Sequence, residues 1–143
     1  MSKASLRIGP LLPGETSYVL SSWKKSHRDA PQNDGVPAGA YYDRMNRHVD
    51  ETLEREGVRV FVARDSEHGV ILGWVCVEDL GDTMQLHYVY VRGGAHRRRG
   101  VCTALIGHAL KELPKAELLA YTTRSRFDSV WESWGFEATG GAR

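Results

Sequence analysis

The chain has 143 residues, of which 41% are apolar and 26% are charged. A chain of this size is expected to form a single domain, residues 1–143, around one hydrophobic core, and its composition excludes disorder throughout. The net charge of +1 excludes a global field that would draw the protein to DNA or to an anionic membrane.

The two cysteines and the N-terminal residues indicate the cellular compartment in which the protein is expected. Cys76 and Cys102 lie far apart, without a CxxC motif or a Cys/His cluster, which argues against a disulfide scaffold and predicts no metal site. No apolar stretch reaches the roughly 20 residues that span a bilayer, and Met1 to Ile8 lack a signal-peptide core. We therefore expect a cytoplasmic protein that does not enter a membrane.

Hydrophobic periodicity predicts a strand, two helices and an antiparallel three-stranded meander in the first part of the chain. Between the helices, a stretch rich in Gly and Pro is expected to be a loop. The predicted elements are strand 6–12, helix 14–26, loop 27–40, helix 41–56 and strands 58–64, 70–78 and 84–91.

The second part begins with a polar loop at residues 92–100. A helical period then covers residues 101–113, and a strand at 117–122 and a short helix at 127–134 follow. Strand, helix and strand together are long enough for a right-handed parallel crossover. The expected fold class is α/β, with a mixed sheet made of an antiparallel meander followed by a parallel β-α-β crossover.

The strongest functional signal is the loop that opens onto the third long helix. Arg97, Arg98 and Arg99 precede Gly100, and the first turn of a helix offers unpaired N–H groups and a positive dipole end that suit phosphate oxygens. A ligand with a pyrophosphate is the natural candidate, and the alternative is that the arginines keep a surface turn soluble. Neither a P-loop nor a GxGxxG motif is present, so nucleotide hydrolysis and dinucleotide binding lose their usual support.

Three segments resemble the GNAT superfamily of acyl-CoA-dependent N-acyltransferases: LHYVYV at 86–91, RRRGVC at 97–102 and WESWGF at 131–136. The central motif of that family is Arg or Gln, two residues, Gly, one residue, and Gly or Ala. Arg97, Gly100 and Cys102 occupy it, and Cys102 departs from it. The resemblance implies a GNAT-like fold with splayed central strands and transfer of an acetyl group from acetyl-CoA to a primary amine by direct attack.

The resemblance also implies where coenzyme A binds. Backbone amides of residues 97–103 would hold its pyrophosphate, and the backbone of residues 89–91 would pair with its pantetheine arm. The implied cofactor-binding residues are Val89, Tyr90, Val91, Arg97, Arg98, Arg99, Gly100, Val101, Cys102 and Thr103. Because Cys102 belongs to the phosphate-binding helix and not to the reacting end, an acyl-cysteine route is less favoured than direct attack.

Attack of an amine on a thioester needs a group that takes the amine proton. The family often places a carboxylate early in its central strand, but residues 83–86 contain none. His87 is the nearest titratable candidate, and the alternative is a histidine satisfied on the face of the sheet. Glu78 and Asp79, at the end of the preceding strand, are alternative bases, although turn carboxylates are more often solvated.

The departing thiolate needs a proton. The tyrosine that usually supplies it in the family is replaced by Trp131, which cannot act as an acid. Tyr88, Tyr90 or Tyr121 are candidates to replace it, and solvent is another because a thiolate is only weakly basic.

The acceptor is expected to be a small-molecule or macromolecular amine. Residues 21–26 and 87–91 are most similar to small phage-encoded members of the family, and some phage relatives modify DNA bases. Nucleic acid is therefore an alternative acceptor, although acidic residues intersperse the basic ones around residues 27–40. A non-catalytic binding module is a further alternative, and a homodimer is a possibility because relatives are often dimers.

Overall fold

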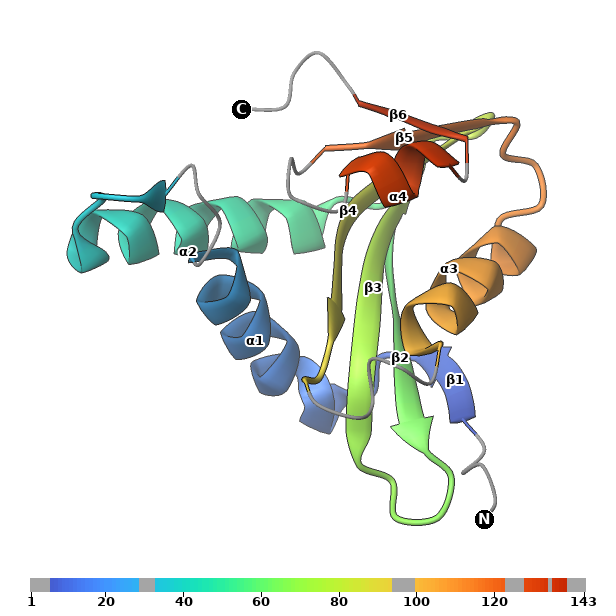
Figure 1. The fold of residues 1–143 in the computed structure, drawn as a ribbon, viewed down its shortest axis with the longest axis horizontal. Helices are drawn as coiled ribbons and strands as arrows, with labels where there is room; N and C mark the ends of the chain where they lie inside the picture. Colours follow the sequence, from blue (N-terminus) through green and yellow to red (C-terminus); the bar gives the residue numbers. More distant parts are fainter. Residues whose placement is uncertain (1–5, 29–32, 94–99, 123–127, 134, 139–143) are drawn as a thin grey trace.

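The protein folds into a six-stranded mixed sheet with helices on both faces, as seen in a computed structural model that describes residues 6–28, 33–93, 100–122, 128–133 and 135–138 (Figure 1). The strands lie in the order β1-β2-β3-β4-β5-β6, antiparallel from β1 to β4 and parallel from β4 to β6. The elements are β1 (Leu6–Pro10), η1 (Pro13–Glu15), α1 (Thr16–Arg28), α2 (Ala38–Glu54), β2 (Val58–Asp65), β3 (Ile71–Asp79), β4 (Thr83–Val91), α3 (Val101–Glu112), β5 (Leu118–Tyr121), α4 (Asp128–Ser133) and β6 (Phe136–Ala138). The mixed α/β class predicted from the sequence is confirmed. Among the described residues, no helix is both long and apolar enough to cross a bilayer.

Several boundaries differ from those predicted. The first strand ends at Pro10, because a 3-10 turn follows in which the backbone N–H of Leu12 donates to Oε1 of Glu15 at 2.9 Å. The loop predicted over residues 27–40 is shorter, since α1 continues to Arg28 and α2 begins at Ala38. The carbonyl of Pro37 accepts the hydrogen bond of the Tyr41 N–H at 3.0 Å, which starts α2 earlier than its apolar period indicates.

The last strand, β6, was not predicted. It has three residues and pairs in parallel with β5. So short a segment has no periodicity of its own, and its pairing is decided by packing: Phe136 is buried in the same core cluster as Tyr121 of β5.

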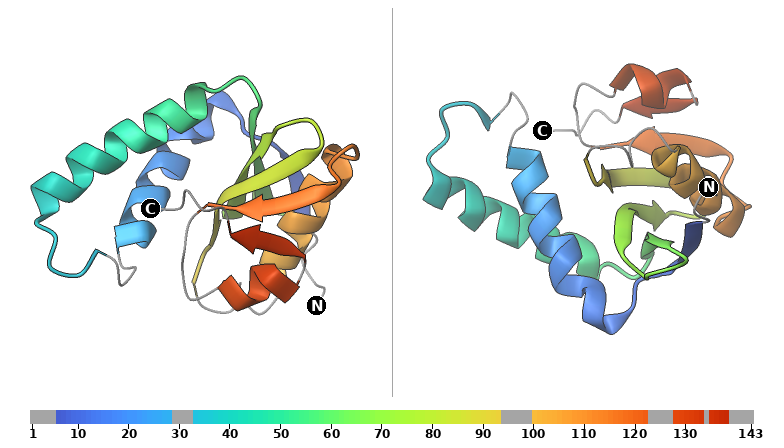
Figure 2. Two further views of the ribbon diagram at one scale, coloured as in Figure 1. Left: turned by 90° about the horizontal axis from the view of Figure 1, so that it is seen from above. Right: turned by 60° about the horizontal axis from the view of Figure 1, so that its bottom comes forward.

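The two faces of the sheet carry separate cores, with α1 and α2 on one face and α3 on the other (Figure 2). Side chains alternate between the two faces along β2 and along β3 from Trp74 onward, as expected of strands buried on both sides. Those that face α1 and α2 are Val60, Val62, Trp74 and Cys76, and those that face α3 are Phe61, Ala63, Leu72, Val75 and Val77. Among the aromatic residues of this core, Trp23, Tyr41 and Trp74 are buried, and Tyr42 is partly buried.

The central strands part halfway along β4. β3 pairs with β4 along its length, but the ladder between β4 and β5 joins only residues 83–86 to residues 118–121. Figure 1 shows β5 and β6 crossing the upper end of β3 and β4 at a steep angle. The splay implied by the resemblance is therefore present, and it begins at Leu86.

Candidate functional site

A β-bulge marks the point at which β4 and β5 separate. Cys76 of β3 is opposite Tyr88, and the next residue, Val77, is opposite Leu86, so His87 is the extra residue of the bulge. Such an extra residue re-aims the side chains that follow it. Two consecutive side chains, those of His87 and Tyr88, consequently lie on the face of the sheet that α1 and α2 cover, since His87 contacts Glu78 and Tyr88 packs on Trp23.

The structure brings His87 and Glu78 together. The Nε2 atom of His87 lies 2.7 Å from Oε1 of Glu78, and its Nδ1 atom lies 3.2 Å from the hydroxyl of Thr122, directly after β5. Both side chains of the pair are buried. A carboxylate only accepts hydrogen bonds, so His87 donates its Nε2–H to Glu78 and turns the lone pair of Nδ1 toward the threonine hydroxyl.

Burial and hydrogen bonding set the charges of this pair. Burial lowers the pKa of His87 and outweighs the opposing effect of Glu78, so the imidazole is neutral at pH 7. Burial raises the pKa of Glu78, but hydrogen bonds from His87 and from Arg55 outweigh it, so the pKa is lowered and the side chain is a carboxylate. The pair is therefore a carboxylate beside a neutral imidazole.

The two candidate bases, His87 and Glu78, differ in how their proton-accepting atoms are hydrogen-bonded. Both ring nitrogens of His87 have partners, namely Glu78 and Thr122. On Glu78, both His87 and Arg55 contact the single oxygen Oε1, and Oε2 accepts no hydrogen bond from the residues that the structure describes. Glu78 Oε2 is thus the atom of the pair with a lone pair available to a proton.

The tyrosines named as candidate acids are held by other groups. The hydroxyl of Tyr88 is bonded to Oγ of Ser26 at 2.7 Å, and that of Tyr121 donates to Oε2 of Glu132 at 3.0 Å. Tyr90 packs edge-on against Tyr18. Trp131, at the position of the family's usual tyrosine, is buried in the core beneath α3.

The start of α3 lies next to the C-terminal end of β4. Gly100 is its N-cap, with a φ of 74°, a conformation that favours glycine, and a Cβ built there would meet open space. On β3, a Cβ at Gly73 would come within 2.6 Å of the carbonyl oxygen of Tyr90 and 3.2 Å of Val101. The lack of a side chain at Gly73 thus lets the helix start approach the end of β4.

The remaining candidates for the cofactor site divide as follows. Val101 is buried, Cys102 is half-buried and Thr103 is exposed in the first turn of α3. Burial raises the pKa of Cys102 to about 11, so its thiol is protonated at pH 7. Val89, Tyr90 and Val91 lie on β4 beyond the end of its ladder with β5. Arg97, Arg98 and Arg99 lie outside the described residues.

The corner between α1 and α2 is closed by hydrogen bonds. Tyr41 donates its hydroxyl proton to the carbonyl of Lys24 at 2.7 Å, and Asn33 donates to the carbonyl of His27 at 2.7 Å. Burial lowers the pKa of His27 to about 4, with a smaller contribution from nearby basic groups, so it is neutral here. Arg28 covers the rings of Tyr41 and Tyr42. His27, Tyr41 and Tyr42 therefore form an aromatic wall beside the bulge, and the Arg28 guanidinium covers part of it.

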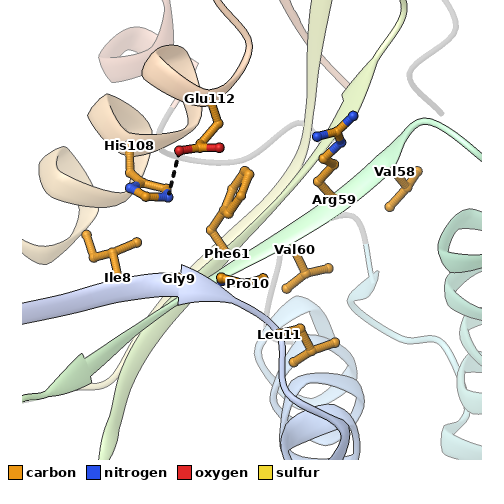
Figure 3. A pocket seen from close by; sticks show the side chains of 10 residues that line it. All are labelled: Ile8, Gly9, Pro10, Leu11, Val58, Arg59, Val60, Phe61, His108 and Glu112. Atoms are coloured by element: carbon orange, nitrogen blue, oxygen red, sulfur yellow. Dashed lines mark ion pairs between the residues drawn. The ribbon is translucent and has the colours of Figure 1, made fainter.

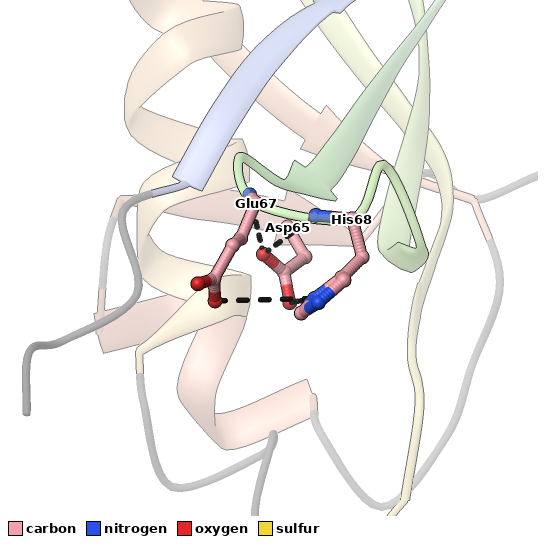
Figure 4. A group of neighbouring side chains, drawn as sticks. All are labelled: Asp65, Glu67 and His68. Atoms are coloured by element: carbon pink, nitrogen blue, oxygen red, sulfur yellow. Dashed lines mark hydrogen bonds and ion pairs between the residues drawn. The ribbon is translucent and has the colours of Figure 1, made fainter.

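Two other features lie away from the bulge. A cavity of about 610 Å³ opens between β1, β2 and α3, and its lining includes Glu112 and the contacting rings of Phe61 and His108 (Figure 3). In the turn after β2, Asp65, Glu67 and His68 gather their side chains (Figure 4). Oδ1 of Asp65 accepts the backbone N–H of Glu67 at 2.7 Å, so the turn itself explains that grouping.

Sequence reasoning missed three contributors to the site. Arg55 and Thr122 lie outside every motif, and they reach the pair from the end of α2 and the end of β5. The bulge at His87 was also missed, because nothing in the run LHYVYV distinguishes a bulged strand from a regular one. The available signal in the sequence was a histidine in one predicted strand and a glutamate at the end of the preceding strand.

Comparison with known proteins places this geometry in a family. The sequence pattern described as the acetyltransferase (GNAT) family matches residues 20–131, which is most of the chain. Comparison with curated protein sequences gives no match.

Solved structures share the fold. A protein from Pyrococcus furiosus described as an acetyl transferase superimposes with a TM-score of 0.70, at 19% identity over 95% of each chain. An acetyltransferase from Clostridium acetobutylicum, solved with acetyl-CoA, gives 0.68 at 14% identity over 96% of this chain and 93% of its own. A ribosomal-protein-alanine N-acetyltransferase from Brucella melitensis gives 0.60 at 17% identity over 92% and 91%. Similarity at these identities establishes the shared fold.

Proposed function

The chain belongs to the acetyltransferase (GNAT) family, and we propose that it transfers an acetyl group from acetyl-CoA to a primary amine by direct attack. The observation that carries the proposal is the convergence of a carboxylate, an imidazole and a strand splay at one bulge. The acceptor is a small-molecule or macromolecular amine, and residues 1–143 act as one domain.

The start of α3 and the end of β4 fit the donor. The first amides of α3, at Val101, Cys102 and Thr103, have no intrahelical partner by the geometry of a helix start, and they suit the pyrophosphate of coenzyme A. The open space at Gly100 leaves room for an anion beside them. The backbone of residues 89–91 lies beyond the ladder with β5, which supports its pairing with the pantetheine arm. Acetyl-CoA supplies the thioester whose carbonyl carbon the amine attacks.

Glu78 is the proton acceptor in this proposal. Its Oε2 takes a proton from the attacking amine, directly or through one water molecule, and its carboxylate is ionised at neutral pH. His87 donates a hydrogen bond to Oε1 and helps to fix the rotamer of the carboxylate. The carboxylate that the family often has on its central strand is here contributed by the neighbouring strand, at the position opposite Gln85.

No cysteine takes part. Cys76 is buried, its pKa is raised by that burial, and Cys102 is protonated at neutral pH. A protonated thiol is a poor nucleophile, which supports direct attack over an acyl-cysteine route. The thiolate that leaves is weakly basic, so water suffices to protonate it.

Binding and turnover test the proposal separately. Titration calorimetry with acetyl-CoA should give heat of binding. Turnover is followed as free thiol released from acetyl-CoA, which should appear only after an acceptor from a panel of primary amines is added. The panel should include diamines, amino sugars, and peptides with free N-terminal alanine or lysine. Absence of both heat and a thermal shift at millimolar acetyl-CoA would overturn the proposal.

A further inference from the structure

We propose that Arg55 is a positioning residue of the proton-accepting pair: from the end of α2 it holds Glu78 ionised and fixed at the bulge. The inference rests on the proposed role of Glu78 in acyl transfer. Arg55 touches neither reacting partner, and it acts through the carboxylate alone.

Two hydrogen-bond donors meet at Oε1 of Glu78. Nη1 of Arg55 lies 3.0 Å from that oxygen, and Nε2 of His87 lies 2.7 Å from the same oxygen. Two donors on one oxygen orient the carboxylate group, because rotation of the group would break both bonds. The second oxygen, Oε2, is thereby kept in one place.

The backbone around Arg55 is anchored on both sides. Its N–H donates to the carbonyl of Thr52 at 3.2 Å, and its own carbonyl accepts the N–H of Val58 at 3.2 Å. The turn then lies against the end of β3, where the N–H of Asp79 donates to the carbonyl of Gly57 at 2.8 Å. A Cβ at Gly57 would lie 2.4 Å from the carbonyl oxygen of Asp79, so this approach requires glycine. These contacts hold the turn that carries Arg55 against the end of β3, where Glu78 lies.

The charges around the Glu78 carboxylate favour its ionised form. Arg55 is permanently charged and favours the ionised form of Glu78, while its positive charge disfavours a protonated His87. Within the described part of the chain, the other titratable groups that face this pair are His48 of α2, whose pKa is lowered chiefly by burial, and the buried thiol of Cys76. Neither carries a charge at pH 7. Arg55 is therefore the charged group that opposes the protonation of both members of the pair.

The experiment replaces Arg55 and follows the pair itself. Arg55→Gln and Arg55→Met remove the charge, and the methionine keeps the apolar stem. The matched control is Arg59→Gln: Arg59 is 49% exposed where Arg55 is 50% exposed, but it pairs with Asp79 at 3.8 Å. The titration of His87 is read from its ring resonances by NMR in the full chain without substrates. The pH dependence of kcat is then measured with an accepted amine, and circular dichroism checks folding.

Both neutral variants should move the His87 titration to higher pH and shift the acidic limb of kcat to higher pH. Their loss of kcat at neutral pH should be smaller than that of Glu78→Gln, and KM for acetyl-CoA should be unchanged. Arg59→Gln should change neither the His87 titration nor the acidic limb of kcat. A folded Arg55→Gln or Arg55→Met with a His87 titration like that of the wild type would overturn the inference, as would an equal shift in Arg59→Gln. Because the NMR titration needs no turnover, a failure of acetyl transfer would contradict the proposed function, whereas the effect of Arg55 on the pair would still be decided by the His87 titration.

Discussion

The hydroxyl of Tyr88 lies 2.7 Å from Oγ of Ser26, so the residue that follows the bulge in β4 is bonded to the end of α1. Ser26 has one hydroxyl proton, and it donates that proton to the carbonyl of Ser22 at 2.6 Å. Tyr88 is therefore the donor in its bond to Ser26, and its ring stacks on Trp23 at 5.5 Å between centroids. The proton of Tyr88 points to α1.

Tyr88→Phe tests whether this tyrosine is structural. Loss of the hydrogen bond should lower the free energy of unfolding by about 1 kcal/mol, and kcat should stay within a few-fold of the wild type. Ser26→Ala, which removes the same bond from the other side, should have a similar effect in urea denaturation. A fall in kcat of a hundredfold in Tyr88→Phe, without a matching fall in Ser26→Ala, would assign Tyr88 to catalysis.

Glu78→Gln removes the proposed proton acceptor. Because general bases contribute about 10²- to 10⁴-fold, kcat should fall within that range while binding of acetyl-CoA, measured by calorimetry, is retained. Asp79→Asn is the matched control, since Asp79 is the next carboxylate along the chain and pairs with Arg59 instead. Equal losses in both variants would contradict the assignment of Glu78.

Gly100→Glu places a carboxylate at the start of α3. It should abolish detectable binding of acetyl-CoA in calorimetry, because like charges repel at the pyrophosphate site. Gly69→Glu is the control for backbone strain: Gly69 has a φ of 70°, Gly100 has a φ of 74°, and a Cβ meets open space at both. Each change should cost about 1 kcal/mol of stability. Retained binding in Gly100→Glu would remove this loop from the donor site.

Glu15 makes the stability of the fold depend on pH. The hydrogen bond from Arg64, with Nε 2.6 Å from Oε2, is the main reason that the pKa of Glu15 is lowered. A lowered pKa in the folded state stabilises the protein above the ordinary value of 4.5, and the contribution is lost as pH falls through the folded pKa. Glu15→Gln should therefore cost about 2 kcal/mol at pH 7. Urea denaturation should show the gap to the wild type narrowing as the pH falls below 4.5, and a constant gap would contradict the mechanism.

Gly57→Ala tests the close approach between the turn after α2 and the end of β3. The added Cβ would lie 2.4 Å from the carbonyl oxygen of Asp79, so the turn must move and about 1–3 kcal/mol of stability should be lost. Gly107→Ala is the contrasting change, because Gly107 is exposed inside α3 with open space around it. It should stabilise by about 0.5–1 kcal/mol. In thermal unfolding, the midpoint should fall below that of the wild type for Gly57→Ala and rise above it for Gly107→Ala. An unchanged midpoint for Gly57→Ala would show that the turn tolerates displacement.

The order and type of most elements, the mixed sheet and the family resemblance follow from the sequence alone. These features depend on neighbours within a few residues: the helical period of residues 101–113, the alternation along residues 58–64, and the Gly-rich loop before a helix. Local backbone preference and one-sided burial leave such a mark because they recur along a single segment. His87 and Glu78 could be named as candidates for the same reason, as titratable groups at the ends of predicted strands.

Only the tertiary structure decided how those candidates work together. Glu78 and His87 are 9 residues apart, Arg55 and Glu78 are 23 apart, and His87 and Thr122 are 35 apart. Their meeting depends on the register of β3 against β4, a bulge that turns two consecutive side chains to one face, and a glycine that admits the turn after α2. Pairing between distant strands is fixed by packing across the whole sheet, and a shift of one residue would send each side chain to the opposite face.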